Sequence, residues 1–320
     1  MRFLKEKYDI DVIGFGALNM DNYFHVDEIA VSDSESQIIN KDSSCGGSAA
    51  NTIIGLSHLN INTSYIGKIA EDDEGETLEM NLISSGVYLN NLLYESNGSS
   101  GKVYDFLDEN GNRALYVDPG VNDEISIDEI DINNVKDSKI IHYSSFVGNS
   151  FNAQNDLIDL LPASIILSFD PGRVYVKKGL QALEKILKRT NILLINEIEL
   201  GMLFNIDNDN KDNENYKKIA KKALEYGIEY VIVKRGAYGV YGLTFEEEVE
   251  VSSFKVDVVD TTAAGDLFNT GFLYSYLKNY SLKKSCTIAN WIASKSVENI
   301  GLLGIPNLNE LNKFERELDN

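Results

Sequence analysis

Four short apolar runs decide the fold: KIIHYSSF (139–146), SIILSFD (164–170), NILLINE (191–197) and YVIVKRG (230–236). Segments with helical spacing lie between them, notably residues 174–190 and 214–227. Buried strands that alternate with amphipathic helices are typical of βαβ units in a parallel sheet. We therefore predict an α/β fold with three layers, in which a mostly parallel, Rossmann-like sheet lies between two layers of helices.

Polar residues gather where these runs end. The runs close on FDPGR (169–173), NEIE (196–199) and KRGAYG (234–239). Ligands of parallel α/β sheets bind beyond the carboxyl ends of the strands, so this edge is predicted to carry the chemistry. Asp170 serves such a site or caps the turn before a proline. An earlier run, DIDVIGFG (9–16), predicts the first strand of the same sheet.

A small β-rich layer is predicted beside the main sheet. Residues 102–107 (KVYDFL) and 113–117 (RALYV) read as strands, and DENGN between them supplies turn residues. Residues 22–44 are also mixed and polar. We expect one domain, residues 1–320, with a small β lid that is formed from parts of 17–45 and 95–120.

The bulk composition limits the partners. Hydrophobic residues make up 43% of the 320 residues, as in an ordinary globular protein, and the formal net charge is −21. Nucleic acid and anionic membrane surfaces are poor partners for so acidic a chain. No apolar stretch is long enough to predict a membrane span.

Other residues indicate a cytoplasmic protein. The first ten residues, MRFLKEKYDI, have scattered charges and no apolar core of a secretory signal. Two cysteines, Cys45 and Cys286, are too few for a disulfide framework, which fits a reducing compartment. Three histidines lie far apart without the spacing of zinc ligands: His25, His58 and His142.

The segment DTTAAGD, residues 260–266, precedes a stretch with helical spacing. Its small residues Ala263, Ala264 and Gly265 let the backbone approach a ligand, and free N–H groups at a helix N-terminus bind anions. Asp266 falls in the first helical turn. A carboxylate there favours the helix dipole, or it accepts a proton from an attacking hydroxyl beside a bound phosphate.

Two earlier segments carry groups suited to a polyol. Asn19 and Asp21 follow the first strand, and an amide paired with a carboxylate can grip vicinal hydroxyls, although both residues also favour turns. Gly46 and Gly47 open the segment GGSAAN, which ends at Asn51. Adjacent glycines permit a close approach to a ligand, or simply form a loop into the helix that follows.

The strand ends at 196–199 and 234–235 offer a metal ligand and positive charge. Glu199 is the kind of hard oxygen ligand that Mg²⁺ prefers, although acidic residues are common at strand ends. Lys234 and Arg235 are expected to supply positive charge near phosphates. No G-x-x-x-x-G-K-[ST] segment occurs in the chain, so a P-loop is excluded.

The intact DTTAAGD segment resembles the DTxxAGD signature of the ribokinase-like carbohydrate kinases, the phosphofructokinase-B family. The GGSAAN, N-x-D and N-x-x-E segments also match that family, in its order and at its spacing, so the resemblance covers nearly the whole chain. It implies a ribokinase-like fold and transfer of the γ-phosphate of ATP to a hydroxyl of a sugar.

The resemblance also implies a role for each matching residue. Asp266 is the catalytic base, and the backbone of Ala263, Ala264 and Gly265 stabilises the phosphoryl group. The residues implied to bind substrate are Asn19, Asp21, Gly46, Gly47 and Asn51. Those implied to bind ATP are Asn196, Lys234, Gly236, Gly239 and Asn290. Glu199 is implied to hold Mg²⁺, often through water in this family, and Asp260 and Thr262 match positions that hold a monovalent cation such as K⁺.

Three functions remain open at this stage. Ribokinases usually carry Lys where this chain has Ser48, so ribose is not the favoured sugar. The first hypothesis is a sugar kinase that acts on a primary hydroxyl, and the second is a nucleoside kinase that acts on a 5′-hydroxyl. A nucleoside kinase would need an apolar slot for the base, with candidates Phe24, Phe106, Tyr116 and Phe146. The third is a catalytically silent sugar-binding protein. Lids of the family often pair between subunits, which implies a homodimer.

Overall fold

The computed structural model describes residues 9–204 and 215–319, which contain a nine-stranded sheet. The strand order is β13-β12-β11-β10-β9-β8-β1-β4-β5, and all neighbours are parallel except for β12 and β13 at one edge. The strands are β1 (Val12–Phe15), β4 (Thr63–Ala70), β5 (Leu92–Glu95), β8 (Ile140–Tyr143), β9 (Ile166–Phe169), β10 (Ile192–Asn196), β11 (Tyr230–Lys234), β12 (Val240–Leu243) and β13 (Glu248–Val251).

Helices cover both faces of this sheet, as the alternation of strands and helices predicts. One face packs against helices α1 (Ser48–His58), α2 (Asp73–Ser84), α9 (Ala264–Leu277), α10 (Leu282–Ser296) and α11 (Leu308–Leu318). The other face packs against α4 (Ser150–Leu160), α5 (Gly172–Val176), α6 (Leu180–Arg189), α7 (Glu197–Leu203) and α8 (Asn215–Leu224). A further short helix, α3 (Ile132–Lys136), precedes β8. The predicted three-layer α/β fold is confirmed.

The central strands are apolar throughout because both of their faces are buried. Along β10, Leu193 and Ile195 pack into one hydrophobic cluster while Ile192 and Leu194 pack into the other. Fully burying each such side chain is worth about 1.5–3 kcal/mol. This two-sided burial explains why these strands read as continuous runs and not as alternating patterns.

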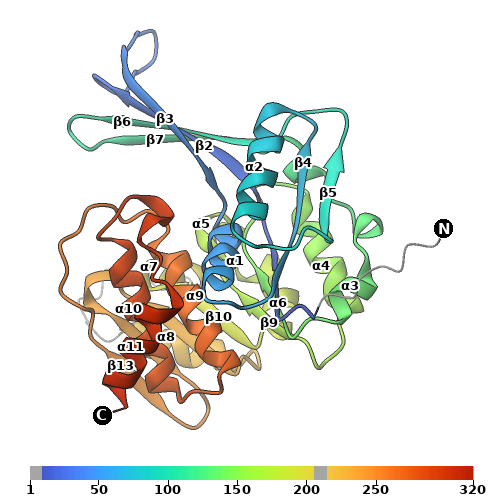
Figure 1. Ribbon diagram of the computed structural model, residues 1–320, viewed down its shortest axis with the longest axis vertical. Helices are drawn as coiled ribbons and strands as arrows, with labels where there is room; N and C mark the ends of the chain where they lie inside the picture. Colours follow the sequence, from blue (N-terminus) through green and yellow to red (C-terminus); the bar gives the residue numbers. More distant parts are fainter. Residues whose placement is uncertain (1–8, 205–214, 320) are drawn as a thin grey trace.

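A separate four-stranded sheet, the small sheet, projects away from the main body toward the upper left of Figure 1. It contains β2 (Asn19–Val26), β3 (Ile38–Gly46), β6 (Gly101–Asp108) and β7 (Arg113–Asp118), in the order β3-β2-β6-β7. The predicted hairpin forms β6 and β7. Its turn is closed by Asp108, whose side chain accepts hydrogen bonds from Asn110 and Asn112.

Two predicted helical segments differ from the structure in their bounds. Residues 174–190 do not form one helix, because the chain breaks at Gly179, where φ is 83°, between α5 and α6. Glycine reaches this left-handed conformation without the steric cost that a side chain adds. The segment 214–227 forms α8 from Asn215, and Glu214 lies outside the described residues.

Both cysteines are free thiols, Cys45 half-buried and Cys286 buried. Within residues 9–204 and 215–319, histidine, cysteine and acidic side chains form no cluster of three that would hold a metal ion. Across the same residues, every helix is too short or too polar to cross a membrane.

Candidate active site

Asp266 lies in the first turn of α9, at the carboxyl edge of the main sheet. The preceding Ala263 adopts a left-handed backbone (φ 59°, ψ 1°) and starts the helix, and its carbonyl accepts from Leu267 N–H at 2.9 Å. A non-glycine residue in this conformation costs roughly 1–2 kcal/mol. The small side chain of alanine keeps the turn open to a ligand.

This turn presents fewer free donors than the sequence implies. The N–H of Ala264 donates to the carbonyl of Thr261 at 3.3 Å. Gly265 and Asp266 occupy the next helical positions, whose N–H groups have no acceptor within a helix. The N–H groups of the turn that remain available to an anion are therefore those of Gly265 and Asp266, at the positive end of the α9 dipole.

The Asp266 carboxylate is held by two side chains from α1. Ser48 Oγ donates to Oδ1 at 2.6 Å, and Asn51 Nδ2 donates to Oδ2 at 2.8 Å. Thr52 Oγ1 also reaches the Asp266 carbonyl, at 3.1 Å. The GGSAAN and DTTAAGD segments therefore meet at one point. Asn51 contacts the proposed base, and Ser48, which the sequence marked only as a departure from ribokinases, fixes the same carboxylate.

Burial raises the pKa of Asp266 to about 6. Hydrogen bonds from Ser48 and Asn51 oppose this rise, the Asp170 carboxylate adds to it, and the Lys234 ammonium opposes it. A general base works best when its pKa lies near the working pH. Asp266 is therefore better suited to proton transfer near neutral pH than an exposed aspartate would be.

Asn19 lies at the start of β2, beside a small cavity that Ala17 and Phe146 also line. Its Oδ1 accepts from Nδ2 of the buried Asn122 at 2.8 Å. Asn122 Nδ2 also donates to the carbonyl of Leu18 at 2.7 Å, and Asn122 Oδ1 accepts from the N–H of Leu18 at 3.0 Å. Asn122 thus fixes the Asn19 amide, a role that nothing in its sequence context signals.

The two glycines of GGSAAN make room for Asp21 and for the chain turn. A Cβ at Gly46 would overlap the Asp21 carboxylate. Gly47 has φ 124°, and a Cβ there would overlap the carbonyl of Ala17. Both positions therefore require glycine because neighbouring groups of the protein itself leave no room for a side chain.

Asp105 and Arg113 stand on the same face of the small sheet as Asp21. Successive side chains of a strand alternate between its faces, and Asp105 pairs with Tyr23, two residues after Asp21. Arg113 Nε donates to both Asp105 oxygens, at 2.8 and 2.9 Å. Burial raises the pKa of Asp21 to about 7, helped by the charges of Asp105 and Asp266 and opposed by Arg113. No local pattern in the sequence predicts this ion pair.

Four aromatic residues are predicted from the sequence to line a slot for a nucleoside base, and the prediction is wrong for three of them. Phe24 stacks on Phe106 at 4.9 Å, and Phe106 meets Tyr116 edge-on at 6.0 Å. They lie on the face of the small sheet opposite Asp21, because Phe24 is an odd number of residues away from it. Only Phe146 lines the small cavity beside Asn19.

We predict that kcat/KM rises with pH through an apparent pKa of 6 to 7 and then levels off. Asp266 must be ionised to accept a proton, so activity falls about tenfold per pH unit below its pKa. Because Asp21 and Asp266 interact, the apparent values belong to the pair. The measurement is kcat/KM from pH 5 to 9. In Asp21→Asn the lower limb should persist near pH 6, and a flat profile would contradict the prediction.

A larger cavity of about 360 Å³ adjoins Asp266 and brings together the residues predicted to bind ATP. Its lining comes from the starts of α1 and α9, from the second half of α10 and from the carboxyl ends of β9, β10 and β11. It includes Ser48, Asp170, Asn196, Glu199, Lys234, Gly236, Gly239, Ala264, Gly265, Asp266 and Asn290. The segments that sequence reasoning singled out therefore converge on one site.

Asn196 and Glu199 form a capping box at the start of α7. Asn196 Oδ1 accepts from Glu199 N–H at 2.8 Å, and Glu199 Oε2 accepts from Asn196 N–H at 3.2 Å. Burial raises the pKa of Glu199, the Asp170 carboxylate adds to the rise, and Lys234 opposes it. The N-x-x-E segment thus has a structural role, and it still presents a carboxylate to the cavity.

The two adjacent basic residues have different positions. Lys234 lines the cavity. Arg235 turns away, where its Nε donates to Glu197 at 3.0 Å and its guanidinium lies 3.9 Å from the centre of the Tyr216 ring. The expectation that both residues supply charge near phosphates is therefore wrong for Arg235, because neighbouring residues at a strand end point to opposite sides.

The side chains of Asn290 and Asp260 form hydrogen bonds with backbone groups. Asn290 Nδ2 donates to the carbonyl of Ser252 at 2.9 Å, which ties α10 to the chain after β13. Asp260 accepts from the N–H groups of Thr262 at 2.8 Å and Gly301 at 2.9 Å. Burial opposes ionisation of Asp260, but these bonds hold its pKa below the ordinary value.

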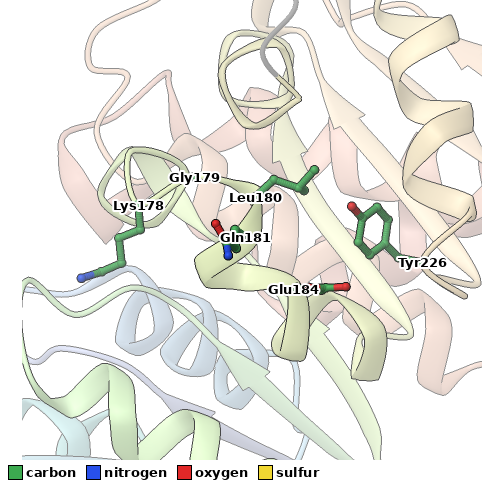
Figure 2. Close-up of a pocket in the computed structure, with 6 residues that line it drawn as sticks. All are labelled: Lys178, Gly179, Leu180, Gln181, Glu184 and Tyr226. Carbon is green, nitrogen blue, oxygen red and sulfur yellow. The ribbon is translucent and has the colours of Figure 1, made fainter.

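A separate cavity of about 500 Å³ lies at the turn between α5 and α6. Figure 2 shows Leu180 and Glu184 on the side of Tyr226, while the Lys178 side chain points the other way. Although this cavity is larger, its lining contains none of the residues that the sequence predicts for the site. We therefore assign the chemistry to the cavity beside Asp266.

The family model for pfkB family carbohydrate kinases matches residues 9–307. The match includes every motif of the site described above, and the chain therefore belongs to the pfkB family of carbohydrate kinases. It is a kinase, a phosphotransferase with a hydroxyl group as acceptor.

Individual relatives agree with this family. An uncharacterized sugar kinase of Archaeoglobus fulgidus is 41% identical over 78% of this chain and 96% of its own. An ATP-dependent ribose-1-phosphate kinase of Halopiger xanaduensis is 27% identical over 96% of this chain and 99% of its own. The crystal structure of a ribokinase from Thermotoga maritima has a TM-score of 0.83 at 25% identity, over 96% of this chain and 99% of that one. Other relatives are nucleoside kinases and fructokinases.

Proposed function

We propose that this kinase transfers the γ-phosphate of ATP to a hydroxyl of a sugar, with Asp266 as the base. The observation that carries the proposal is the position of Asp266. Asp266 lines the cavity that contains the expected ATP residues, and its charge also acts on Asp21. Its raised pKa and the free N–H groups beside it provide a base and an anion site in one helical turn.

In the proposed reaction Asp266 takes the proton from the acceptor hydroxyl. The hydroxyl oxygen forms a bond to the γ-phosphorus, the bond from that phosphorus to the bridging oxygen of ADP breaks, and ADP leaves. The N–H groups of Gly265 and Asp266 bind the charge that the phosphoryl group carries during transfer. Ser48 and Asn51 keep the carboxylate turned toward the acceptor.

The acceptor is proposed to bind between Asn19, Asp21 and Asp266, beneath the small sheet as a lid. Asp21, with Asn19 held by Asn122, offers hydrogen bonds to vicinal hydroxyls. Glycines at 46 and 47 let the sugar approach the backbone. A lid matters because water would otherwise compete with the sugar for the phosphoryl group.

Mg²⁺ is proposed to act with ATP, and the residues present fit this metal. Glu199 presents a half-buried carboxylate whose pKa is raised, so a nearby cation would favour its ionised form. Mg²⁺ is usually held by one or two carboxylates, waters and the substrate phosphates, and it neutralises phosphate charge when bound. A monovalent cation such as K⁺ is proposed beside Asp260 and Thr262, where the carboxylate keeps free lone pairs.

A nucleoside kinase remains the second candidate because of one observation. The small cavity beside Asn19 has apolar walls, Phe146, Val117 and Val147, next to the amides of Asn19 and Asn122. An apolar wall suits a nucleobase as well as the apolar face of a sugar ring.

The cytoplasm, where ATP is available, is the proposed compartment. A second copy of the chain is proposed to pair with the first through the small sheet. The projecting sheet leaves apolar side chains in solvent on both faces, and they include Ile39 at 57%, Leu115 at 51% and Tyr116 at 64% exposure. Exposed apolar patches of this kind mark protein interfaces.

The direct test is ADP release with Mg²⁺ and ATP over a panel of pentoses, hexoses, sugar phosphates, keto-sugar acids and nucleosides, with and without K⁺. One sugar class should raise ADP release well above the acceptor-free rate. Preference for nucleosides would favour the second candidate. If no acceptor raises the rate, the proposed function fails.

A further inference from the structure

Lys234 belongs to a buried group of three side chains at the floor of the cavity beside Asp266. Its Nζ donates to Asp170 Oδ2 at 2.7 Å and to Asn269 Oδ1 at 3.2 Å. Asn269 Nδ2 donates to the same Asp170 oxygen at 2.7 Å. The Lys234 and Asp170 side chains are 13% and 8% exposed, and Asn269 is fully buried. The ammonium is therefore fixed at two points by side chains from β9 and α9.

The same ammonium stands next to the anion-binding turn. A Cβ at Gly265 would lie 3.6 Å from Lys234 Nζ, within ordinary contact distance. Lys234 also lines the cavity together with Gly265 and Asp266, and it is the one basic side chain among the described residues of that lining. A positive charge therefore stands beside the free N–H groups of Gly265 and Asp266.

The charges around Lys234 keep it protonated. Burial alone would lower its pKa, but the Asp170 carboxylate, which also accepts its hydrogen bond, and the nearby Glu199 and Asp266 raise the pKa above the ordinary value. Burial likewise opposes ionisation of Asp170, yet Lys234 and the hydrogen bond from Asn269 hold the pKa of Asp170 below its ordinary value. The pair is charged throughout the physiological range.

A purely structural ion pair explains this arrangement poorly. A buried pair is often no more stabilising than apolar side chains of the same size, because both charges must leave water. Here the ammonium also faces a cavity whose other titratable side chains are the carboxylates Asp170, Glu199 and Asp266. Phosphates entering such a site need a compensating cation from the protein.

We propose that Lys234 is a catalytic residue that contacts the γ-phosphoryl group beside Gly265, and that Asp170 and Asn269 are positioning residues that hold its ammonium there. This inference rests on the proposed function. It separates Lys234 from the general ATP-binding role that the sequence implies, and it gives Asp170 a function beyond the turn before Pro171.

The test compares nucleotide binding and turnover in wild type, Lys234→Met, Asp170→Asn and Asp170→Glu. Binding of Mg·ATP and Mg·ADP is measured by calorimetry without acceptor, so this arm does not depend on the sugar. Lys234→Met should weaken ATP binding at least tenfold and ADP binding less than threefold, since only ATP has the γ-phosphate. Asp170→Asn should weaken ATP binding more than ADP binding, but by a smaller factor than Lys234→Met. Asp170→Glu keeps the carboxylate, so its affinity for ATP should stay closer to that of wild type.

In the presence of an acceptor, Lys234→Met should lower kcat at least 10²-fold. The factor by which the KM for the acceptor changes should be smaller than this. Lys255→Met, in an exposed loop, is the matched control and should behave as wild type. If Lys234→Met fails to fold, Asp170→Asn decides, because it keeps the size and the hydrogen bond to Lys234.

Two results would overturn the inference. One is an unchanged affinity for both ATP and ADP in a folded Lys234→Met variant. The other is equal weakening of both nucleotides, which indicates a structural role. Wild type that binds neither nucleotide would instead refute the proposed function itself. Wild type that binds ATP but phosphorylates no acceptor would refute only the proposed acceptor, and the binding ratio would still test Lys234.

Discussion

Asp266→Asn should lower kcat at least 10²-fold while ATP binding changes less than threefold. The amide has nearly the same size as the carboxylate but cannot accept the hydroxyl proton, and general base catalysis is worth about 10²–10⁴-fold. Ser48 can still donate to the remaining oxygen, and Asn51 can turn its amide to meet the new N–H₂ group. The measurements are steady-state kinetics with a productive acceptor and calorimetry with Mg·ATP.

The same variant should fold at least as stably as wild type at neutral pH. The pKa of Asp266 in the fold, about 6, lies above the ordinary aspartate value of 3.8, so folding favours the protonated form. Ionisation of Asp266 therefore lowers the free energy of unfolding of wild type above pH 6, by on the order of 3 kcal/mol at most. This loss of stability vanishes below pH 4. Thermal melting at pH 7.5 checks this point. Asp257→Asn, exposed in the preceding loop, is the control and should leave kcat unchanged.

Asp21→Ala should reduce kcat/KM for the acceptor by about 10²-fold or more and leave the KM for ATP within threefold. Asp21 is a half-buried carboxylate that is proposed to accept hydrogen bonds from substrate hydroxyls, and the variant leaves those hydroxyls without a partner in the site, which costs roughly 1–3 kcal/mol for each group. Because Asp21 lies on the side of Asn19 and not in the ATP cavity, the effect should fall on the acceptor alone. Initial rates with each substrate varied in turn measure the two effects separately.

The control for this variant is Asp42→Ala. Asp42 is an exposed carboxylate on β3, opposite Tyr23 and further out along the small sheet. It should leave both constants near those of wild type. Equal losses in the two variants would mean that Asp21 acts through the stability of the small sheet, and an unchanged acceptor kcat/KM in Asp21→Ala would remove it from the substrate site.

The sequence predicted the parts of the fold that depend on local patterns. Runs such as NILLINE are apolar because both faces of β10 are buried, and such runs between helical segments leave few arrangements other than a parallel sheet. The DENGN turn likewise predicted the β6–β7 hairpin. The break at Gly179 escaped prediction because one glycine within a helical pattern is often tolerated.

The site residues that the sequence missed act through long-range contacts. Asn122 fixes Asn19 across 103 positions of the chain, and Ser48 holds Asp266 across 218. Asp105 and Arg113 meet Asp21 only because β2 and β6 pair in one register. A single sequence carries no record of such pairings, whereas DTTAAGD is compact enough to show its helix start, its small residues and its carboxylate together.

The most direct test of the central claim is the fate of labelled phosphate from [γ-³²P]ATP in a single turnover with a productive acceptor. Wild type should transfer the label to an organic phosphate ester of the acceptor, with little released as inorganic phosphate. Asp266→Asn should form that ester at least 10²-fold more slowly with ATP still bound. Label that goes to water, or an ester formed at the wild-type rate by Asp266→Asn, would contradict phosphoryl transfer with Asp266 as the base.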